Sequence, residues 1–200
     1  MDKQETVLSW IDVGKSKDAN KYIHPAGSKS DEEYWFSGRY EAQSIQQKIG
    51  VADSILEFGC GNGRILRNID HPHVYGVDIS PELIAGLENA YLVSEFTKIV
   101  DAIYSISVFI HLKRIEAIEA LKWIYEHLSP NGKAYLQIPI YEADRDPYSF
   151  IDVGVWCPAE FIKCINQVGF EIEQMWVSAG LFSYDNIGLN HNELQVLTKM

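Results

Sequence analysis

The most constraining feature of this chain is a short apolar run that breaks into three alternating glycines and then resumes. Residues 55–66 read Ile-Leu-Glu-Phe-Gly-Cys-Gly-Asn-Gly-Arg-Ile-Leu, with glycines at 59, 61 and 63. Glycine adopts positive φ without steric cost and has no Cβ, so the backbone of such a loop can lie directly against a bound molecule. The pattern predicts a ligand loop at the carboxyl end of a strand, where the chain turns into a helix.

A second strand-like segment follows and ends in an acid. Residues 75–78 read Tyr-Gly-Val-Asp. In nucleotide-binding α/β sheets, an acid at the tip of the neighbouring strand binds ribose hydroxyls. The glycine loop and Asp78 together predict a nucleoside site. An alternative role for Asp78 is to cap the helix that begins near Ser80.

The glycine spacing separates two kinds of nucleotide cofactor. Dinucleotide sites use Gly-x-Gly-x-x-Gly, whose third glycine lets the helix pack closely while its amino end binds a pyrophosphate. That third position is Arg64 when counted from Gly59 and Leu66 when counted from Gly61. A bulky residue there disfavours NAD and FAD, and the chain has no Gly-x-x-x-x-Gly-Lys-Ser/Thr phosphate loop. The sequence therefore favours a nucleoside without phosphates.

The segment from Glu57 to Arg64 resembles the first motif of class I S-adenosylmethionine (SAM) dependent methyltransferases. Three later segments are similar to further parts of that family, in the same order. Residues 100–112 resemble its fourth strand and the segment after it, 128–138 its turn and fifth strand, and 156–172 its last helix and sixth strand. The resemblance covers residues 34–199. It implies an α/β fold with a doubly wound, mostly parallel seven-stranded sheet whose last strand is antiparallel.

The resemblance also implies roles for individual residues. The strand acid Glu57 and the glycine loop would surround the methionine moiety of SAM, and Asp78 would bind both ribose hydroxyls. Glu95 and Phe96 stand where the family has an acid for the adenine amino group and an apolar neighbour of the ring. Ser105 and Ile106 resemble residues that flank the methyl group. The full set of expected cofactor-binding residues is Glu57, Gly59, Cys60, Gly61, Asn62, Gly63, Arg64, Asp78, Ile79, Glu95, Phe96, Ser105 and Ile106.

Candidates for the acceptor side are fewer. His111 follows the fourth expected strand and could serve as a general base, because imidazole accepts a proton near neutral pH. The alternative is that its ring only fixes the following turn. Tyr141 and His24 are further candidates. The aromatic residues 34–36 could either cover the cofactor or anchor the first helix to the sheet.

Composition limits the partners. The net charge is -11, and no Lys/Arg-rich run provides a footprint for nucleic acid or for an anionic membrane surface. No apolar run approaches the roughly 20 residues that span a bilayer. Three cysteines without metal-ligand spacing, in a chain without a signal peptide, favour reduced thiols and a cytoplasmic location. We expect no bound metal, and the oligomeric state is left open.

Organisation along the chain indicates an N-terminal arm, residues 1–33, before a SAM-binding methyltransferase domain, residues 34–200. One helix is expected from Ser30 and a second toward Gly50, with a further short helix at residues 63–69. The helix that begins near Ser80 has an apolar face that extends to Leu87, and residues 115–128 form an amphipathic helix. A fifth strand is expected at 134–138, a helix at 158–167, and two last strands at 170–177 and 193–199. A third strand at 91–93 is followed too soon by the fourth, at 99–105, for a helical crossover. Either a helix is missing at this point, or the third strand lies elsewhere.

Together, these features predict a SAM-dependent methyltransferase that acts on a small molecule, with O-methylation slightly favoured over N-methylation, and that releases S-adenosylhomocysteine (SAH). Base N-methylation is disfavoured because no Asp/Asn-Pro-Pro-aromatic tetrapeptide follows the fourth strand. One alternative is a non-catalytic SAM-binding regulatory or partner subunit. The other is an aminopropyl transferase, for which Asp144 and Asp146 are the only nearby carboxylate pair.

Overall fold

The computed structural model describes residues 10–17, 19, 30–142, 144–147, 154–178 and 193–200. Within them lies a seven-stranded sheet of order β3-β2-β1-β4-β5-β7-β6. Its strands are β1 (Ile55–Phe58), β2 (Val74–Asp78), β3 (Ala90–Leu92), β4 (Val100–Ser105), β5 (Leu128–Leu136), β6 (Phe170–Ser178) and β7 (Glu193–Lys199). The first five pair in parallel, and β7 pairs antiparallel with both β5 and β6. The sheet that the resemblance implied is confirmed.

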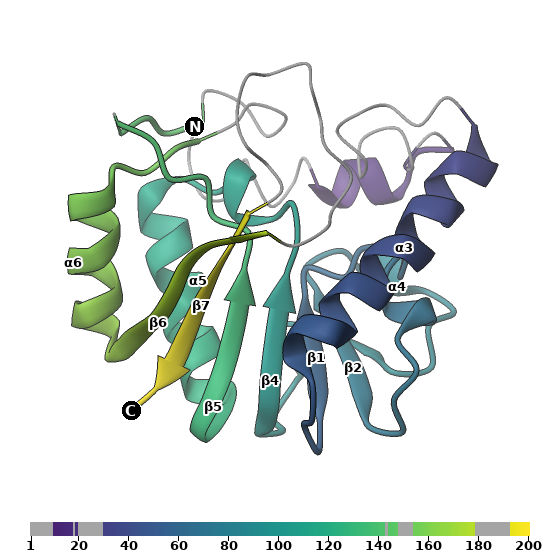
Figure 1. Cartoon of the computed structure of the whole chain (residues 1–200). Coiled ribbons are helices and arrows are strands. Elements are labelled where there is room, and N and C mark those ends of the chain that lie inside the picture. The colour runs from purple at the N-terminus through teal and green to yellow at the C-terminus, as the bar shows by residue number, and fades with distance from the viewer. Residues whose placement is uncertain (1–9, 18, 20–29, 143, 148–153, 179–192) are drawn as a thin grey trace.

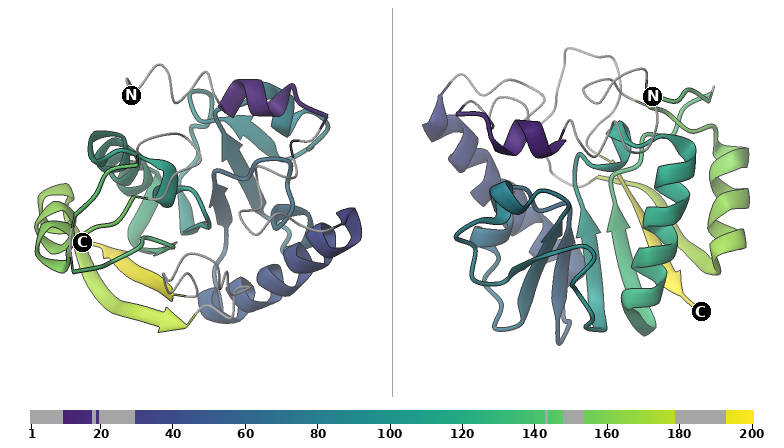
Figure 2. Two further views of the ribbon diagram at one scale, coloured as in Figure 1. Left: turned by 90° about the horizontal axis from the view of Figure 1, so that it is seen from above. Right: turned by 180° about the vertical axis from the view of Figure 1, so that it is seen from behind.

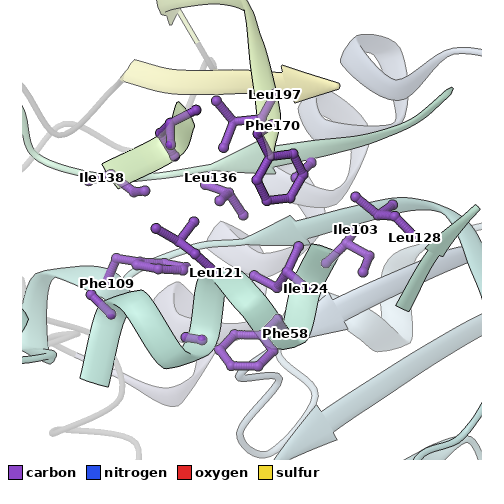
Figure 3. Packing of buried hydrophobic residues seen from close by; sticks show 14 of the residues in the cluster. Phe58, Ile103, Phe109, Leu121, Ile124, Leu128, Leu136, Ile138, Phe170 and Leu197 are labelled. Atoms are coloured by element: carbon purple, nitrogen blue, oxygen red, sulfur yellow. The ribbon is translucent and has the colours of Figure 1, made fainter. Parts of the chain in front are cut away.

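Helices cover both faces of the sheet (Figures 1 and 2). Helix α3 (Asp31–Ile49) lies on one face, and α5 (Arg114–His127) and α6 (Pro158–Val168) lie on the other. Each face has its own apolar core. Leu121 and Ile124 of α5 belong to a large cluster with strand and α6 residues (Figure 3), whereas Ile45 and Ile49 of α3 belong to a smaller one. Because side chains alternate along a strand, each central strand contributes to both cores.

Helix α3 is one continuous helix, so the expectation of two helices in this region is wrong. Its N-cap is Ser30, whose Oγ accepts a hydrogen bond from the Glu33 amide at 3.2 Å. Buried residues then recur at a spacing of three or four through the whole length: Tyr34, Ser37, Gly38, Glu41, Ala42, Ile45 and Ile49. The buried stripe is unbroken, so one helix forms. In the sequence, the polar and small members of this stripe interrupt the apolar pattern, which is why two helices were expected.

The connection between β3 and β4 contains no helix. Strand β3 lies close to where the sequence predicts it, and residues 93–99 form a turn followed by an irregular segment. In the sheet, β2 and β1 lie between β3 and β4, and neighbouring strands are about 4.8 Å apart. Seven residues can cross this distance only in an extended conformation, at about 3.3 Å per residue, and not as a helix. A helix is therefore missing here, as the first alternative held. The ring of Phe96 fills the space beside the sheet and packs against Tyr91, Tyr75 and Trp123.

Three local predictions need correction. The glycine loop leads into successive turns and a 3-10 helix, η1 (Leu66–Asn68), and not into an α-helix over residues 63–69. The helix after Ser80, α4 (Pro81–Ile84), is shorter than its apolar pattern suggested. Strand β5 begins directly after α5, because residues 128–133 bulge against β4 around Asn131, whose φ is 63°. In each case the sequence pattern indicated an element at the correct place but predicted the wrong length or helix type.

We predict that Gly38→Ala destabilises the protein. Alanine normally stabilises a helix relative to glycine, but a Cβ at position 38 would lie 2.1 Å from the backbone oxygen of Arg64. Backbone cannot move away easily, so the free energy of unfolding should fall by about 1–3 kcal/mol. Chemical denaturation measures this change. Gln47→Ala, at an exposed position of the same helix, is the matched control and should stay within about 0.5 kcal/mol of the parent protein.

Candidate functional site

The glycine loop forms a concave backbone surface at the carboxyl end of β1. Gly59, Gly61 and Gly63 have φ angles of 77°, 52° and 80°, as the sequence predicted. The amides of Gly59 and Cys60 both donate to the Val77 carbonyl, at 2.8 and 3.0 Å, which ties the loop to β2. A Cβ at position 59 would lie 2.3 Å from a methyl group of Val108. Only glycine allows this approach between the loop and the segment after β4.

Asp78 ends β2 directly beside the loop. One carboxylate oxygen accepts from the Gly61 amide at 2.8 Å, and the other accepts from the Ser80 amide at 2.9 Å. Burial raises the pKa of Asp78, and these two amide hydrogen bonds act in the opposite direction. Each carboxylate oxygen can accept a second hydrogen bond, so the group can receive a pair of ligand hydroxyls while it holds the loop. Ser80 makes no side-chain cap bond to α4.

A cavity of about 390 Å³ opens beside the loop and Asp78. This volume lies in the range of small-molecule sites. Six of the predicted site residues line the cavity: Gly59, Gly61, Asp78, Ile79, Ile106 and His111. Further lining residues come from α5, from the segment after β4 and from the arm. Among the lining residues, all of which belong to the described part of the chain, there is no lysine or arginine, so the walls suit a cationic or hydrogen-bond-donating ligand better than a phosphate.

The described part of the arm covers this cavity. Residues 10–14 are helical and lie above the carboxyl ends of the parallel strands (Figure 1, purple). The Trp10 and His111 rings meet edge to face with centroids 5.4 Å apart, and both line the cavity. At the other end of this turn, a Cβ on Gly14 would lie 2.4 Å from Ser80 Oγ. The arm thus bridges from the segment after β4 to the start of α4. His24 lies outside the described residues.

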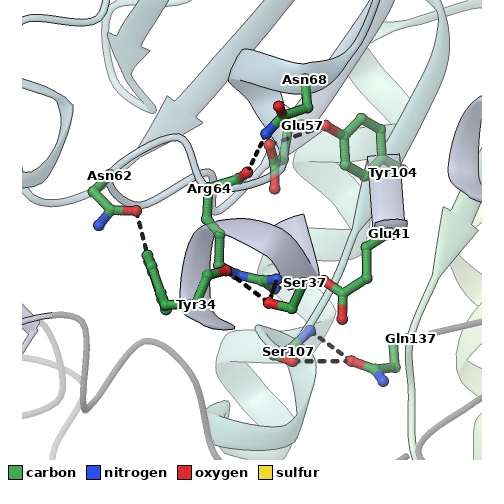
Figure 4. A network of polar contacts seen from close by, with 10 residues as sticks. All are labelled: Tyr34, Ser37, Glu41, Glu57, Asn62, Arg64, Asn68, Tyr104, Ser107 and Gln137. Carbon is green, nitrogen blue, oxygen red and sulfur yellow. Dashed lines mark hydrogen bonds and ion pairs between the residues drawn. The ribbon is translucent and has the colours of Figure 1, made fainter. Parts of the chain in front are cut away.

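Glu57 faces away from the cavity. It pairs in register with Tyr104 on β4, and the Tyr104 hydroxyl donates to its carboxylate at 2.9 Å (Figure 4). Strand alternation places both side chains on the α3 face, opposite Phe58, which lines the cavity. Burial raises the pKa of Glu57 to about 8, although the Tyr104 hydrogen bond and the nearby Arg64 oppose this shift. The structure therefore gives Glu57 a donor within the protein.

Arg64 and Asn62 also connect the loop to α3. The Arg64 guanidinium forms a buried ion pair with Glu41 at 2.6 Å and donates to Ser37 Oγ at 2.8 Å. The Tyr34 hydroxyl donates to Asn62 Oδ1 at 2.7 Å, and burial raises the pKa of Tyr34 to about 12, so it remains a donor. Figure 4 shows these side chains converging between the loop and the helix. This polar network orients the glycine loop from behind.

The remaining predicted residues lie outside the cavity lining. Cys60 packs against Gly76 of β2, and burial raises the pKa of its thiol. Ser105 Oγ donates to the Phe58 carbonyl at 2.9 Å. Glu95 is exposed, and Tyr141 is 48% exposed. Phe96 belongs to the aromatic cluster on the α5 face of the sheet. Gly63 approaches Leu87. Cofactor contact by these residues stays a prediction.

Several site residues were missed by sequence reasoning. Gln137, just after β5, accepts a hydrogen bond from the amide of Ser107 at 2.6 Å, and Ser107 has a positive φ of 59° and lines the cavity. No local pattern marks this pair, because the two residues lie on different strands' ends. The helical spacing offers one signal for Glu41. It lies three residues after Gly38 and four before Ile45 on the face that α3 buries, where an acid needs a partner. Glu116 of α5 also lines the cavity, and no sequence pattern distinguishes it from the other residues of an amphipathic helix.

The described residues contain no group of three or more His, Cys, Asp or Glu side chains that could hold a metal ion. None of the helices among them is long and apolar enough to cross a bilayer.

A family model described as a methyltransferase domain matches residues 29–184. No curated protein matches the sequence.

Three solved structures illustrate the fold similarity. Magnesium protoporphyrin IX methyltransferase of Synechocystis PCC 6803, with bound SAM, is 14% identical and has a TM-score of 0.65 over 98% of this chain and 97% of that one. An amino pentose methyltransferase of Micromonospora echinaspora is 17% identical, with a TM-score of 0.60 over 88% and 94%. The Burkholderia thailandensis 1,6-didemethyltoxoflavin-N1-methyltransferase is 16% identical, with a TM-score of 0.60 over 82% and 78%.

The Arg64–Glu41 ion pair gives a first prediction for the site. Replacing Glu41 by leucine leaves the guanidinium buried without its carboxylate, so the free energy of unfolding should fall by about 3–5 kcal/mol. Replacing Arg64 by methionine in the same protein should restore part of this loss, because the uncompensated charge is gone. A double-mutant cycle by denaturant unfolding measures the coupling. Additive effects of the two substitutions would contradict the pairing.

The raised pKa of Glu57 predicts a dependence of stability on pH. Between its ordinary value of 4.5 and about 8, the folded protein keeps this proton and the unfolded chain has lost it. The folded state thus binds more protons, and the free energy of unfolding should fall as the pH rises, with a limiting slope of about 1.4 kcal/mol per pH unit. Glu57→Gln, which mimics the neutral acid, should remove this part of the slope. Parallel curves for the two proteins between pH 5 and 8 (about the window set by the two pKa values) would contradict it.

Proposed function

We propose that this chain, which belongs to the methyltransferase domain family and is a SAM-dependent methyltransferase, methylates a small-molecule acceptor through an oxygen nucleophile. The observation that carries the choice of oxygen is the position of His111. Its side chain is 7% exposed and lines the same cavity as Gly59, Gly61 and Asp78. An imidazole at this place can accept a hydroxyl proton.

The residues of the cavity fit SAM. The positive-φ glycine backbone leaves room beside the loop, and Asp78 retains acceptor capacity for the ribose hydroxyls. Acidic and apolar walls suit a molecule that carries positive charge at its sulfonium and ammonium groups. When bound, SAM supplies an electrophilic methyl group on a cationic leaving group.

The contribution of the protein to the reaction is mainly geometric. The transfer is a direct displacement, so the acceptor must be held in line with the methyl group and water must be kept away. Val108 presses on Gly59 and fixes the segment after β4 beside the loop, and Trp10 covers the cavity from the arm. Proton removal by His111 matters for a hydroxyl acceptor, because a neutral alcohol is a weak nucleophile.

A small-molecule acceptor is supported by the neighbours and by the charge. The three structurally similar enzymes named above carry small molecules in their names: a porphyrin, an amino pentose and a toxoflavin precursor. The net charge of -11 disfavours a nucleic acid.

The aminopropyl transferase alternative receives no support from the geometry. Asp144 accepts from the Arg114 guanidinium at 2.8 Å, and Asp146 accepts from the Arg114 amide at 2.9 Å. Neither carboxylate lines the cavity.

The test separates cofactor binding from catalysis with two variants. Calorimetric titration with SAM and SAH, with NAD in parallel, gives the affinities, and release of SAH across a panel of small hydroxyl and amine compounds identifies an acceptor. Asp78→Asn should weaken SAM binding by about 10- to 100-fold, because it weakens hydrogen bonds to a charged group. His111→Asn should leave SAM affinity within a few-fold and lower kcat for a hydroxyl acceptor by about 100-fold or more.

Three results would count against this proposal. Equal loss of SAM affinity in both variants would make His111 a structural residue. Unchanged kcat in His111→Asn, or turnover of amines alone, would contradict the oxygen nucleophile. SAM binding without turnover of any compound, together with tight binding of another protein, would favour a regulatory subunit. Melting temperatures of both variants serve as the control for folding.

A further inference from the structure

We infer that Gln137, just after β5, is a positioning residue for methyl transfer: it holds Ser107 in an unfavourable backbone conformation and so fixes the cavity wall at the end of β4. The inference rests on the function proposed above and adds to it a residue outside the cavity lining. The side chain of Gln137 is 3% exposed, so it acts on the site through Ser107 and not by touching a ligand.

Ser107 has a backbone conformation that serine rarely adopts. Its φ is 59°, and among the described residues Ser107 and Asn131 are the two that combine a positive φ with a residue other than glycine. Asn131 lies in the exposed bulge of β5, whereas Ser107 borders the cavity. Such a conformation is unfavourable by itself and persists where the surrounding structure holds it.

Gln137 provides the hydrogen bonds that hold Ser107. Its Oε1 accepts from the Ser107 amide at 2.6 Å and from the Ser107 hydroxyl at 3.2 Å (Figure 4). The Gln137 backbone is itself fixed, because its amide donates to the Ser105 carbonyl at 2.9 Å and continues the pairing of β4 and β5. Without Gln137 the Ser107 amide would lose its acceptor, and the chain would relax toward a negative φ.

The conformation of Ser107 sets the position of two parts of the site. The next residue, Val108, packs so closely on the glycine loop that a Cβ on Gly59 would lie 2.3 Å from its Cγ2. The Val108 carbonyl also accepts from the His111 amide at 3.0 Å, which closes the 3-10 turn η2 (Phe109–His111). Ser107 thus determines both where Val108 meets the loop and where the His111 side chain enters the cavity.

Loss of Gln137 should therefore affect the reaction more than the binding of the cofactor. The glycine loop is tied to β2 by the bonds from Gly59 and Cys60 to the Val77 carbonyl, and Asp78 is held by the Gly61 amide. None of these bonds involves Gln137 or the segment after β4. A shift of that segment by about 1 Å would leave the cofactor bound but misalign the acceptor, and a misplacement of this size costs about 100-fold in rate.

The experiment combines Gln137→Leu with three second substitutions. Ser107→Gly removes the steric cost of the positive φ, whereas Ser107→Ala removes the same hydroxyl and keeps that cost. Asn131→Gly is the matched control, because it relieves a positive φ far along the chain at an exposed position. Gln137→Asn, whose amide is one methylene too short to reach Ser107, replaces Gln137→Leu if the latter does not fold.

Three quantities are measured for each protein. They are the affinity for SAH by calorimetry, kcat with the acceptor found in the panel, and the hydrogen-exchange rates of the Ser107 and Val108 amides in the ligand-free protein by NMR. Melting temperatures report the effect of each substitution on stability.

In Gln137→Leu we expect kcat to fall about 10- to 100-fold while the affinity for SAH stays within about fivefold of the parent value. The Ser107 amide should exchange at least about tenfold faster, because it has lost its acceptor. Adding Ser107→Gly should raise kcat again by about 5- to 30-fold, since glycine adopts the positive φ without help. Adding Ser107→Ala or Asn131→Gly should not raise it.

Several results would overturn the inference. Unchanged kcat in Gln137→Leu, or a loss of SAH affinity as large as the loss of kcat, would each do so. A loss of kcat that Ser107→Gly does not restore, or that Ser107→Ala or Asn131→Gly restores equally well, would show that Gln137 acts through general stability.

Failure of the proposed function is distinguishable from these results. If the parent protein binds no SAH or turns over no compound, the proposed function fails, and the role in methyl transfer fails with it. Slow exchange of the Ser107 amide that is lost in Gln137→Leu would still support the holding of the segment by Gln137. Turnover of amines alone would contradict the oxygen nucleophile and leave the comparison of these variants unaffected.

Discussion

The buried ion pair between Arg64 and Glu41 is the contact on which the geometry of the site most depends. It joins the end of the glycine loop to the middle of α3, and it lies in a region where both side chains are almost fully hidden from water. A buried pair of this kind adds little net stability, but it tolerates few arrangements, because either charge alone would be strongly unfavourable in that place. The ion pair therefore holds the loop on its α3 side, while the opposite side of the loop remains open to a ligand in the cavity.

Much of the fold could be predicted because burial leaves a regular trace in the sequence. The last strand has the predicted bounds, α5 and α6 lie within a residue or so of theirs, and all three loop glycines have positive φ. What the sequence could not reveal were partners. Whether Glu57 meets a ligand or Tyr104 depends on the register between β1 and β4. Both strands are buried on both faces of the sheet, so their sequences are mostly apolar and do not mark that register. The same holds for Gln137 and Ser107, which meet only because β4 and β5 end side by side.

The errors of extent have a common physical origin. A helix pattern of four to seven residues cannot show where the helix ends, since a short helix depends on tertiary contacts for most of its stability. The segment after the glycine loop thus became turns and a 3-10 helix, and α4 stopped after one turn. The opposite error in α3 arose because Ser37, Gly38 and Glu41 do not look like buried residues until their neighbours are known.

The arm and α5 place two indole rings, Trp10 and Trp123, in the wall of one cavity. The two rings have different surroundings. Trp10 contacts His111 on the side of the arm, and Trp123 stacks on His127 within α5, with 3.8 Å between the ring centroids. Because indole emission depends on the polarity and contacts of its surroundings, ligand binding in the cavity should change the fluorescence of Trp10 and Trp123. Replacing either tryptophan singly by phenylalanine would separate a signal from the arm side of the cavity from a signal at its α5 side.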